Sequence, residues 1–142
     1  DLMERFDIID THSYWNHPVF PGTDWDNRNN YVSNTSILRS PSLGGLGSLS
    51  FMRIKGKPFS VSEYDHPWPN QYAFEMYPLL AAWAAWQDWD MLYTSTADAE
   101  DGGNAEHITG FFDQLRNPVK AAAIPFAARI IEVFPVPLNP SA

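Results

Sequence analysis

Segments with the composition of β-strands alternate along this chain with segments that have the periodicity of α-helices. Strands are predicted at residues 6–11, 58–63 and 90–95, and a helix-like segment follows each of them. This order is typical of parallel-sheet α/β proteins, because a helix commonly forms the crossover between two parallel strands. The alternation therefore predicts about three consecutive βα units with parallel strands.

The predicted helices share apolar residues at helical spacing. In the longest of them Asn70 is the expected N-cap, and Pro78 is expected to bend the helix or to end its first segment. The helices are predicted at residues 43–54, 70–86, 108–115 and 118–132. The polar run at 97–107 is expected to be a loop. Residues 1–134 are assigned to one unit, and the Pro-rich tail at 135–142 is expected to be frayed.

Charge and composition narrow the classes of partner. The formal net charge is -8, which opposes binding to nucleic acid phosphates or to anionic membrane surfaces. The longest apolar run, residues 77–86, is too short to span a bilayer. No cysteine is available for a disulfide or a thiolate metal site. Six Trp and six Tyr residues favour a neutral partner such as a carbohydrate, on whose rings aromatic side chains stack.

Glu63 ends the second predicted strand, and residues at the carboxyl ends of parallel barrel strands face the active site. Tyr64, His66 and Trp68 follow it closely and supply a hydrogen-bond donor, a titratable ring and a stacking surface. The alternative is a structural glutamate that caps the loop or pairs with an arginine. Glu63 is thus a candidate catalytic carboxylate.

A second group of candidates follows the first predicted strand. Asp10, His12 and Tyr14 fall on one face by strand alternation, and Trp15 comes next. His12 and Tyr14 are natural hydrogen-bond partners for a carboxylate or a sugar hydroxyl. The alternative for His12 is a purely structural hydrogen bond at the edge of the sheet.

The ordered set of these segments resembles part of a known family. Residues 56–90, GKPFSVSEYDHPWPNQYAFEMYPLLAAWAAWQDWD, resemble the seventh strand and following helix of the clan A glycoside hydrolases, especially cellulase-like and β-galactosidase-like members. DTHSYW at 10–15 is similar to the His-x-Tyr pattern of their sixth strand. NPVKAAAIPFAARI at 117–130 looks like the helix that closes such barrels.

The resemblance implies a partial (β/α)8 TIM barrel in which residues 1–134 are the C-terminal portion, covering strands six to eight. It implies retaining hydrolysis of β-glycosidic bonds with Glu63 as the nucleophile and His12 and Tyr14 as its active-site pair. The sugar site would be lined by Trp15, Tyr64, His66 and Trp68. No cofactor and no metal are implied. The expected partners are a carbohydrate substrate and either further copies of the chain or the missing part of the barrel.

The sequence departs from the family at one required position. Clan A enzymes take their general acid/base from a Glu that ends strand four, usually after an Asn, and this chain has no Asn-Glu pair. Retaining hydrolysis needs two carboxyl groups roughly 5 to 5.5 Å apart. Asp65 lies too close to Glu63 along the same strand end to reach the leaving group. Because a complete barrel needs roughly 250 residues, and because Asp1 is not a starting Met, we expect a piece of a longer enzyme or an autonomous partial barrel.

Two rival functions stay open. IIDTHSYW is similar to a metal-binding strand of amidohydrolase-type barrels, with Tyr14 in place of the second His; His17, His66 and Asp65 could then complete the site. The other rival is a non-catalytic, homo-oligomeric partial barrel that binds carbohydrate or serves as a scaffold. Exposed sheet edges in an incomplete barrel favour such self-association.

Overall fold

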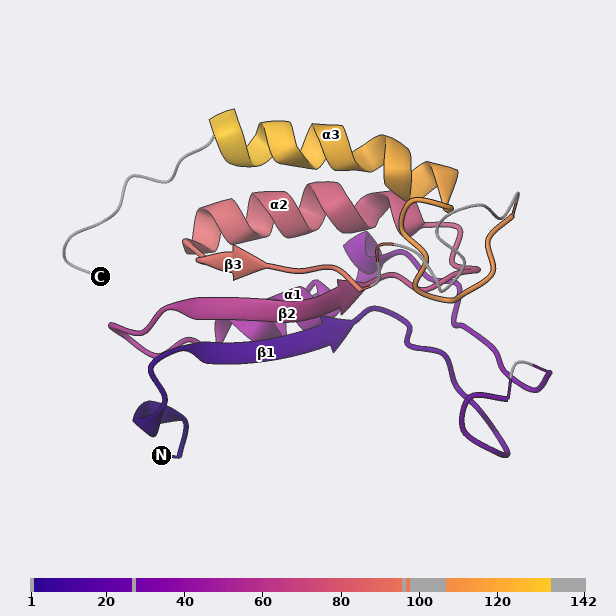
Figure 1. Ribbon diagram of the computed structural model, residues 1–142, viewed down its shortest axis with the longest axis horizontal. Helices are drawn as coiled ribbons and strands as arrows, with labels where there is room; N and C mark the ends of the chain where they lie inside the picture. The colour runs from indigo at the N-terminus through magenta and orange to yellow at the C-terminus, as the bar shows by residue number, and fades with distance from the viewer. Residues whose placement is uncertain (1, 27, 96, 98–106, 134–142) are drawn as a thin grey trace.

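The structure is a computed structural model that describes residues 2–26, 28–95, 97 and 107–133 (Figure 1). The predicted tail at 135–142 lies outside these residues, as does most of the predicted polar loop at 97–107. None of the described helices is both long and apolar enough to cross a membrane.

Three parallel strands form one sheet in the order β1-β2-β3. β1 spans Ile9–Tyr14, β2 spans Phe59–Asp65, and β3 is limited to Met91–Leu92. β2 lies in the centre and pairs in parallel with both neighbours. The predicted mixed α/β class with parallel strands is therefore confirmed.

A helix follows each strand, so the chain contains three consecutive βα units. The helices are α1 at Gly44–Ser50, α2 at Met76–Gln87 and α3 at Pro118–Val133. Short 3-10 turns occur at Met3–Arg5 (η1), Ile37–Arg39 (η2) and Ala73–Glu75 (η3). Figure 1 shows α3 running alongside α2, and α2 running alongside the sheet.

The hydrophobic core lies between the sheet and the helices. Among the strands, β1 sends Ile9 into it and β2 sends Phe59, Val61 and Tyr64, because successive residues of a strand point to opposite faces. The buried members are Ile9, Ile37, Leu46, Leu49, Phe59, Val61, Tyr64, Met76, Leu80, Ala84 and Trp89. The face of the sheet away from this core is called the open face below.

An extra residue in β2 changes which side chains reach the core. Thr11 pairs with Val61, but the next residue of β1, His12, pairs with Glu63, so Ser62 has no partner in the register. This irregularity is a β-bulge, and it reverses the alternation of the strand. Before the bulge Phe59 and Val61 face the core, whereas after it Tyr64 does. Glu63 consequently lies exposed on the open face.

Several element boundaries differ from the sequence-based expectation. The first strand was expected at 6–11 but begins at Ile9, where the Ile9 amide donates to the Pro58 carbonyl at 2.9 Å. The helix expected from Asn70 begins at Met76, because the Asn70 side chain instead accepts from the Tyr72 amide at 2.8 Å and caps a turn. Pro78 therefore lies in the first turn of α2, where its missing N–H leaves no hydrogen bond unmade.

The helix expected at 108–115 is wrong. These residues form turns and bends. The buried carboxylate of Asp113 accepts from the backbone amides of Thr109 and Gly110 at 2.8 and 2.9 Å. Such side-chain hydrogen bonds compete with helical ones and favour a turn.

Candidate functional site

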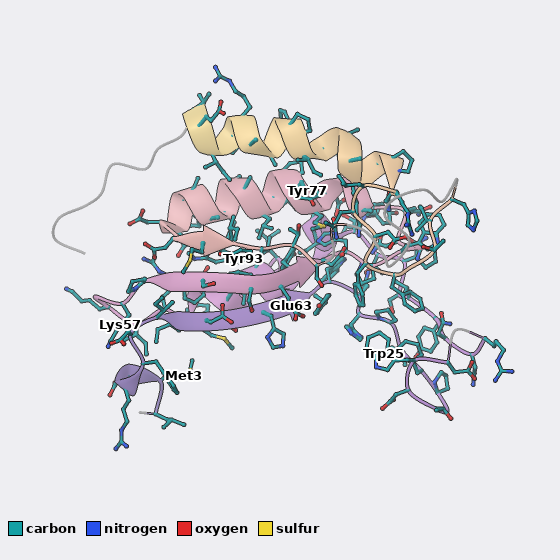
Figure 2. The ribbon with its side chains drawn as sticks, viewed as in Figure 1. Met3, Trp25, Lys57, Glu63, Tyr77 and Tyr93 are labelled. Carbon is teal, nitrogen blue, oxygen red and sulfur yellow. The ribbon has the colours of Figure 1, made fainter. Side chains whose placement is uncertain are left out.

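The open face carries the candidate residues at the carboxyl ends of β1 and β2. His12 and Glu63 are direct neighbours in the strand register, and both side chains are exposed. Ser13 and Trp15 lie on the other side of β1, against Gly45 and Gly44 of α1. His12 and Tyr14, which alternate with them, therefore point to the open face. Figure 2 places Glu63 near the carboxyl ends of these two strands.

Tyr14 donates a hydrogen bond from its hydroxyl to Oε2 of Glu63. Partial burial raises the pKa of Tyr14 to about 12, and the hydrogen bond and charge of Glu63 act in the same direction, against a smaller opposing effect of Ser95. The phenol therefore stays protonated at neutral pH. It is a fixed donor to one oxygen of Glu63, which leaves the other oxygen free to react or to accept from a ligand.

Asp65, the last residue of β2, is fully buried in a polar network. One of its oxygens accepts from Nζ of Lys120 on α3, and the other accepts from Nε2 of Gln114 at 2.5 Å. Burial raises the pKa of Asp65 and lowers that of Lys120, while the contact between the two charges opposes both shifts. Both oxygens are thus occupied, which leaves Asp65 no role at the surface of the site.

Tyr64 and His66 were expected to line a sugar site, but the structure places both in the interior without exposed surface. The bulge at Ser62 turns them toward the helices, where the Tyr64 hydroxyl and Nε2 of His66 lie 3.2 Å apart. Burial, followed by the charge of Lys120, lowers the pKa of His66 to about 3, and burial also raises the pKa of Tyr64. Their placement makes them part of the packing beneath the site.

The two candidate tryptophans occupy different surroundings. Trp15 is half-buried on the helix side of β1, where its Nε1 donates to the Thr35 carbonyl at 2.8 Å. Trp68 is exposed beyond the end of β2, and its backbone amide donates to the Phe111 carbonyl at 2.7 Å. Of the expected aromatic ligand contacts, Trp68 therefore has the most accessible ring.

Sequence reasoning missed an aromatic cluster that surrounds Tyr14. The rings of His17 and Phe112 both contact the ring of Tyr14, and each centroid lies 5.1 Å from the Tyr14 centroid. Trp25 joins the cluster at 5.9 Å from His17 and 6.2 Å from Phe112. Phe112 is almost a hundred residues from Tyr14 in the sequence, so no local pattern indicates this contact. The composition, rich in aromatic residues, is the only sequence signal for it.

The metal site considered from the sequence has no support in the described geometry. Among residues 2–26, 28–95, 97 and 107–133, no group of three or more His, Asp or Glu side chains is arranged to hold a metal ion. Asp65 is bonded to Lys120, and His66 lies within the core.

No family model, no curated protein and no solved structure matches this chain.

Proposed function

We propose that the chain carries the nucleophile half of a retaining β-glycosidase active site, with Glu63 as the nucleophile. The observation that supports this most directly is the hydrogen bond from Tyr14 to Glu63 at the carboxyl edge of a parallel sheet. An exposed carboxylate held on one side by a neutral donor is positioned for attack through its other oxygen. The neighbouring His12 is available to contact a sugar hydroxyl or Glu63.

The fold that suits this function is a partial (β/α)8 barrel. Three consecutive βα units with strands in the order β1-β2-β3 agree with such a segment, and active sites of these barrels lie at the carboxyl ends of the strands. The remaining strands would come from another part of a longer chain or from other copies of this one.

In the proposed reaction, an oxygen of Glu63 forms a bond to the anomeric carbon while the bond to the leaving oxygen breaks. The leaving oxygen takes a proton from a general acid, which we expect another part of a longer chain or another copy to supply. Water then attacks the same carbon, gives a proton back to the group that acted as the acid, and releases the sugar and the Glu63 carboxylate. Asp65 is unsuited to be the acid, because Lys120 and Gln114 already occupy both its oxygens.

A mechanism-based label tests this proposal without the missing acid. A 2,4-dinitrophenyl 2-deoxy-2-fluoroglycoside has a leaving group that departs without protonation, and its fluorine slows release of the sugar from the enzyme. The chain is treated separately with the glucoside, the galactoside and the mannoside. Mass spectrometry should then locate one of these sugars on Glu63. Glu63→Gln should abolish labelling, whereas Asp10→Asn, which alters another exposed carboxylate of the open face, should retain it. An unlabelled protein that is also inactive on aryl glycosides rejects the catalytic role.

The second candidate is a non-catalytic, homo-oligomeric or carbohydrate-binding scaffold. It is favoured by the outer edge of β1, which pairs with no further strand among the described residues and lies near the exposed apolar side chains of Ile8, Phe51 and Met52. Unpaired edges and exposed apolar surface promote association. Light scattering should therefore report a dimer or a larger assembly. A well-folded monomer at micromolar concentration contradicts this expectation.

A further inference from the structure

A hollow of about 580 Å³ opens beyond the carboxyl end of the sheet. Trp25 and Trp68 line it, and their side chains are 57% and 43% exposed. Figure 2 shows Trp25 on the loop that extends past β1. Pockets that bind small molecules commonly have volumes of roughly 300–1,000 Å³, so the hollow is large enough for a ligand.

The wall of this hollow is held in place by hydrogen bonds. The buried carboxylate of Asp113 fixes the turn that starts at Thr109 and Gly110. The carbonyl of Phe111, in the same turn, accepts from the amide of Trp68. The two sides of the hollow are thus connected before any ligand binds, which reduces the entropy lost on binding.

The chemistry of the lining selects a neutral ligand. None of the described lining residues is basic, and the acidic one, Asp113, is buried and already accepts hydrogen bonds. What is offered to a ligand is the two indole rings, with the amide of Asn30 and backbone groups beside them. A pyranose ring fits this combination, because it has apolar C–H faces that stack on aromatic rings and hydroxyls that bond to amides.

The backbone at Trp25 adds a second indication. Its φ of 64° lies in the left-handed region, which a bulky side chain seldom adopts. Such strained residues cluster at ligand-binding sites. The strain at Trp25 is compatible with a loop that is shaped to present its indole.

Ring contacts connect this hollow to the candidate nucleophile. Trp25 contacts Phe112 with a centroid distance of 6.2 Å, Phe112 contacts Tyr14 at 5.1 Å, and Tyr14 bonds to Glu63. We propose that the hollow is a sugar-binding subsite in which Trp25 and Trp68 hold a pyranose ring of an oligosaccharide, adjacent to the ring attacked by Glu63. This inference rests on the proposed glycosidase function for its orientation. It adds that the substrate is a chain of sugars rather than a single glycoside.

Binding and catalysis are measured separately to test this subsite. The full chain carrying Glu63→Gln is titrated with cellohexaose, mannohexaose and a β-1,4-galactan oligosaccharide by calorimetry. Trp25→Ala and Trp68→Ala, each added to that chain, should weaken binding of the best ligand by about five- to tenfold, a typical loss for an aromatic stacking contact. Trp86→Ala is the matched control, because it removes an indole that is 63% exposed on α2. It should bind like the parent.

A second measurement needs no alanine variant to fold. In the unsubstituted chain, NMR signals of the indole N–H groups of Trp25 and Trp68 should shift on addition of the oligosaccharide, while that of Trp86 should not. The subsite is rejected if none of the three oligosaccharides binds, or if Trp25→Ala and Trp68→Ala both bind the ligand as tightly as the parent does. Loss of labelling at Glu63 with intact, Trp25-dependent binding would reject the catalytic proposal and leave the subsite standing. Labelling at Glu63 without Trp25-dependent binding would reject the subsite and leave the catalytic proposal standing.

Discussion

The carboxylate of Asp65 and the ammonium group of Lys120 are in direct contact, and neither side chain has any exposed surface. The pair joins the end of β2 to the first turn of α3, 55 residues further along the chain. Gln114 contacts the same carboxylate and also donates to the carbonyls of Ser95 and Phe112. The pair therefore holds the turn that presents Phe112 against the end of the sheet.

Lys120→Met should strongly destabilise the fold. It leaves the buried carboxylate of Asp65 without its charge partner, and breaking a buried pair in this way typically costs about 3–5 kcal/mol. Asp65→Asn combined with Lys120→Met should recover much of the loss, because no uncompensated charge then remains. The free energy of unfolding from urea titrations measures both effects.

Arg129→Ala is the control: it breaks an exposed ion pair with Glu132 on the same helix and should cost less than about 1 kcal/mol. Equal losses in Lys120→Met and Arg129→Ala would contradict the importance assigned to the buried pair.

Tyr14→Phe should slow the proposed reaction. A hydrogen bond to a charged group contributes about 1.5–3 kcal/mol, which corresponds to a decrease of roughly 10- to 100-fold in the rate of Glu63 labelling by the fluoroglycoside. Tyr93→Phe is the control, because Tyr93 is exposed just after β3 and its hydroxyl contacts the sulfur of Met91 rather than Glu63. If both variants react at the same rate, the hydrogen bond from Tyr14 has no part in positioning the nucleophile.

His66 should make the protein less stable in acid. The unfolded chain takes up a proton at His66 with the usual pKa of about 6.5. In the folded protein, burial and the charge of Lys120 hold the pKa of His66 at about 3. Between these values the unfolded state binds more protons, so stability decreases as the pH falls through this window. From pH 7 to pH 5 His66 alone should contribute a loss on the order of 2 kcal/mol, and Asp65, whose pKa burial raises, should contribute a change in the opposite direction.

Chemical unfolding of the parent and of His66→Gln at several pH values checks this dependence. The change in the free energy of unfolding from pH 7 to pH 5 should be less unfavourable in His66→Gln than in the parent, even where the substitution lowers stability at every pH. An unchanged slope in His66→Gln would show that other groups cause the acid sensitivity.

Gly45→Ala should destabilise the contact between α1 and β1. A methyl group on Gly45 would overlap the Ser13 hydroxyl and lie 2.9 Å from the Ser13 Cβ. Alanine improves helix propensity by up to about 1 kcal/mol, but overpacking typically costs about 1–3 kcal/mol, so a net loss is expected. Ser13→Gly should suppress part of the loss in a double-mutant cycle measured by thermal unfolding. Gly22→Ala, whose methyl would lie 3.5 Å from the Asn29 amide nitrogen, is the control with an ordinary contact.

The sequence predicts the order of the elements well, because that order depends on local periodicity. Three βα units and parallel strands follow from alternating apolar patterns, and α3 at Pro118–Val133 matches the expected 118–132 closely. The start of β1 was misplaced because Ile8 is as apolar as Ile9, and only pairing with β2 decides which of them enters the strand. The false helix at 108–115 has its cause in Asp113, whose hydrogen bonds to the preceding amides favour a turn.

The candidate site was predictable only in part. The proximity of His12, Tyr14 and Glu63 follows from the register of two parallel strands whose ends meet at one edge. The burial of Asp65 required knowledge of Lys120, which approaches from a distant helix. The contact of Phe112 with Tyr14 is equally non-local. Neither is accessible to reasoning from spacing alone.

Ser62 differs from the other residues of β2 because it has no partner in the register with β1. The strand from Phe59 to Asp65 contains two phases of alternation, and Ser62 is the step between them. Deleting this one serine would leave Val61 and Glu63 adjacent, opposite Thr11 and His12, so the strand would alternate regularly and the Glu63 carboxylate would stay on the open face. The bulge therefore absorbs one additional residue without changing the side to which Glu63 points, whereas the same seven residues paired without a bulge would turn the Glu63 carboxylate toward the core.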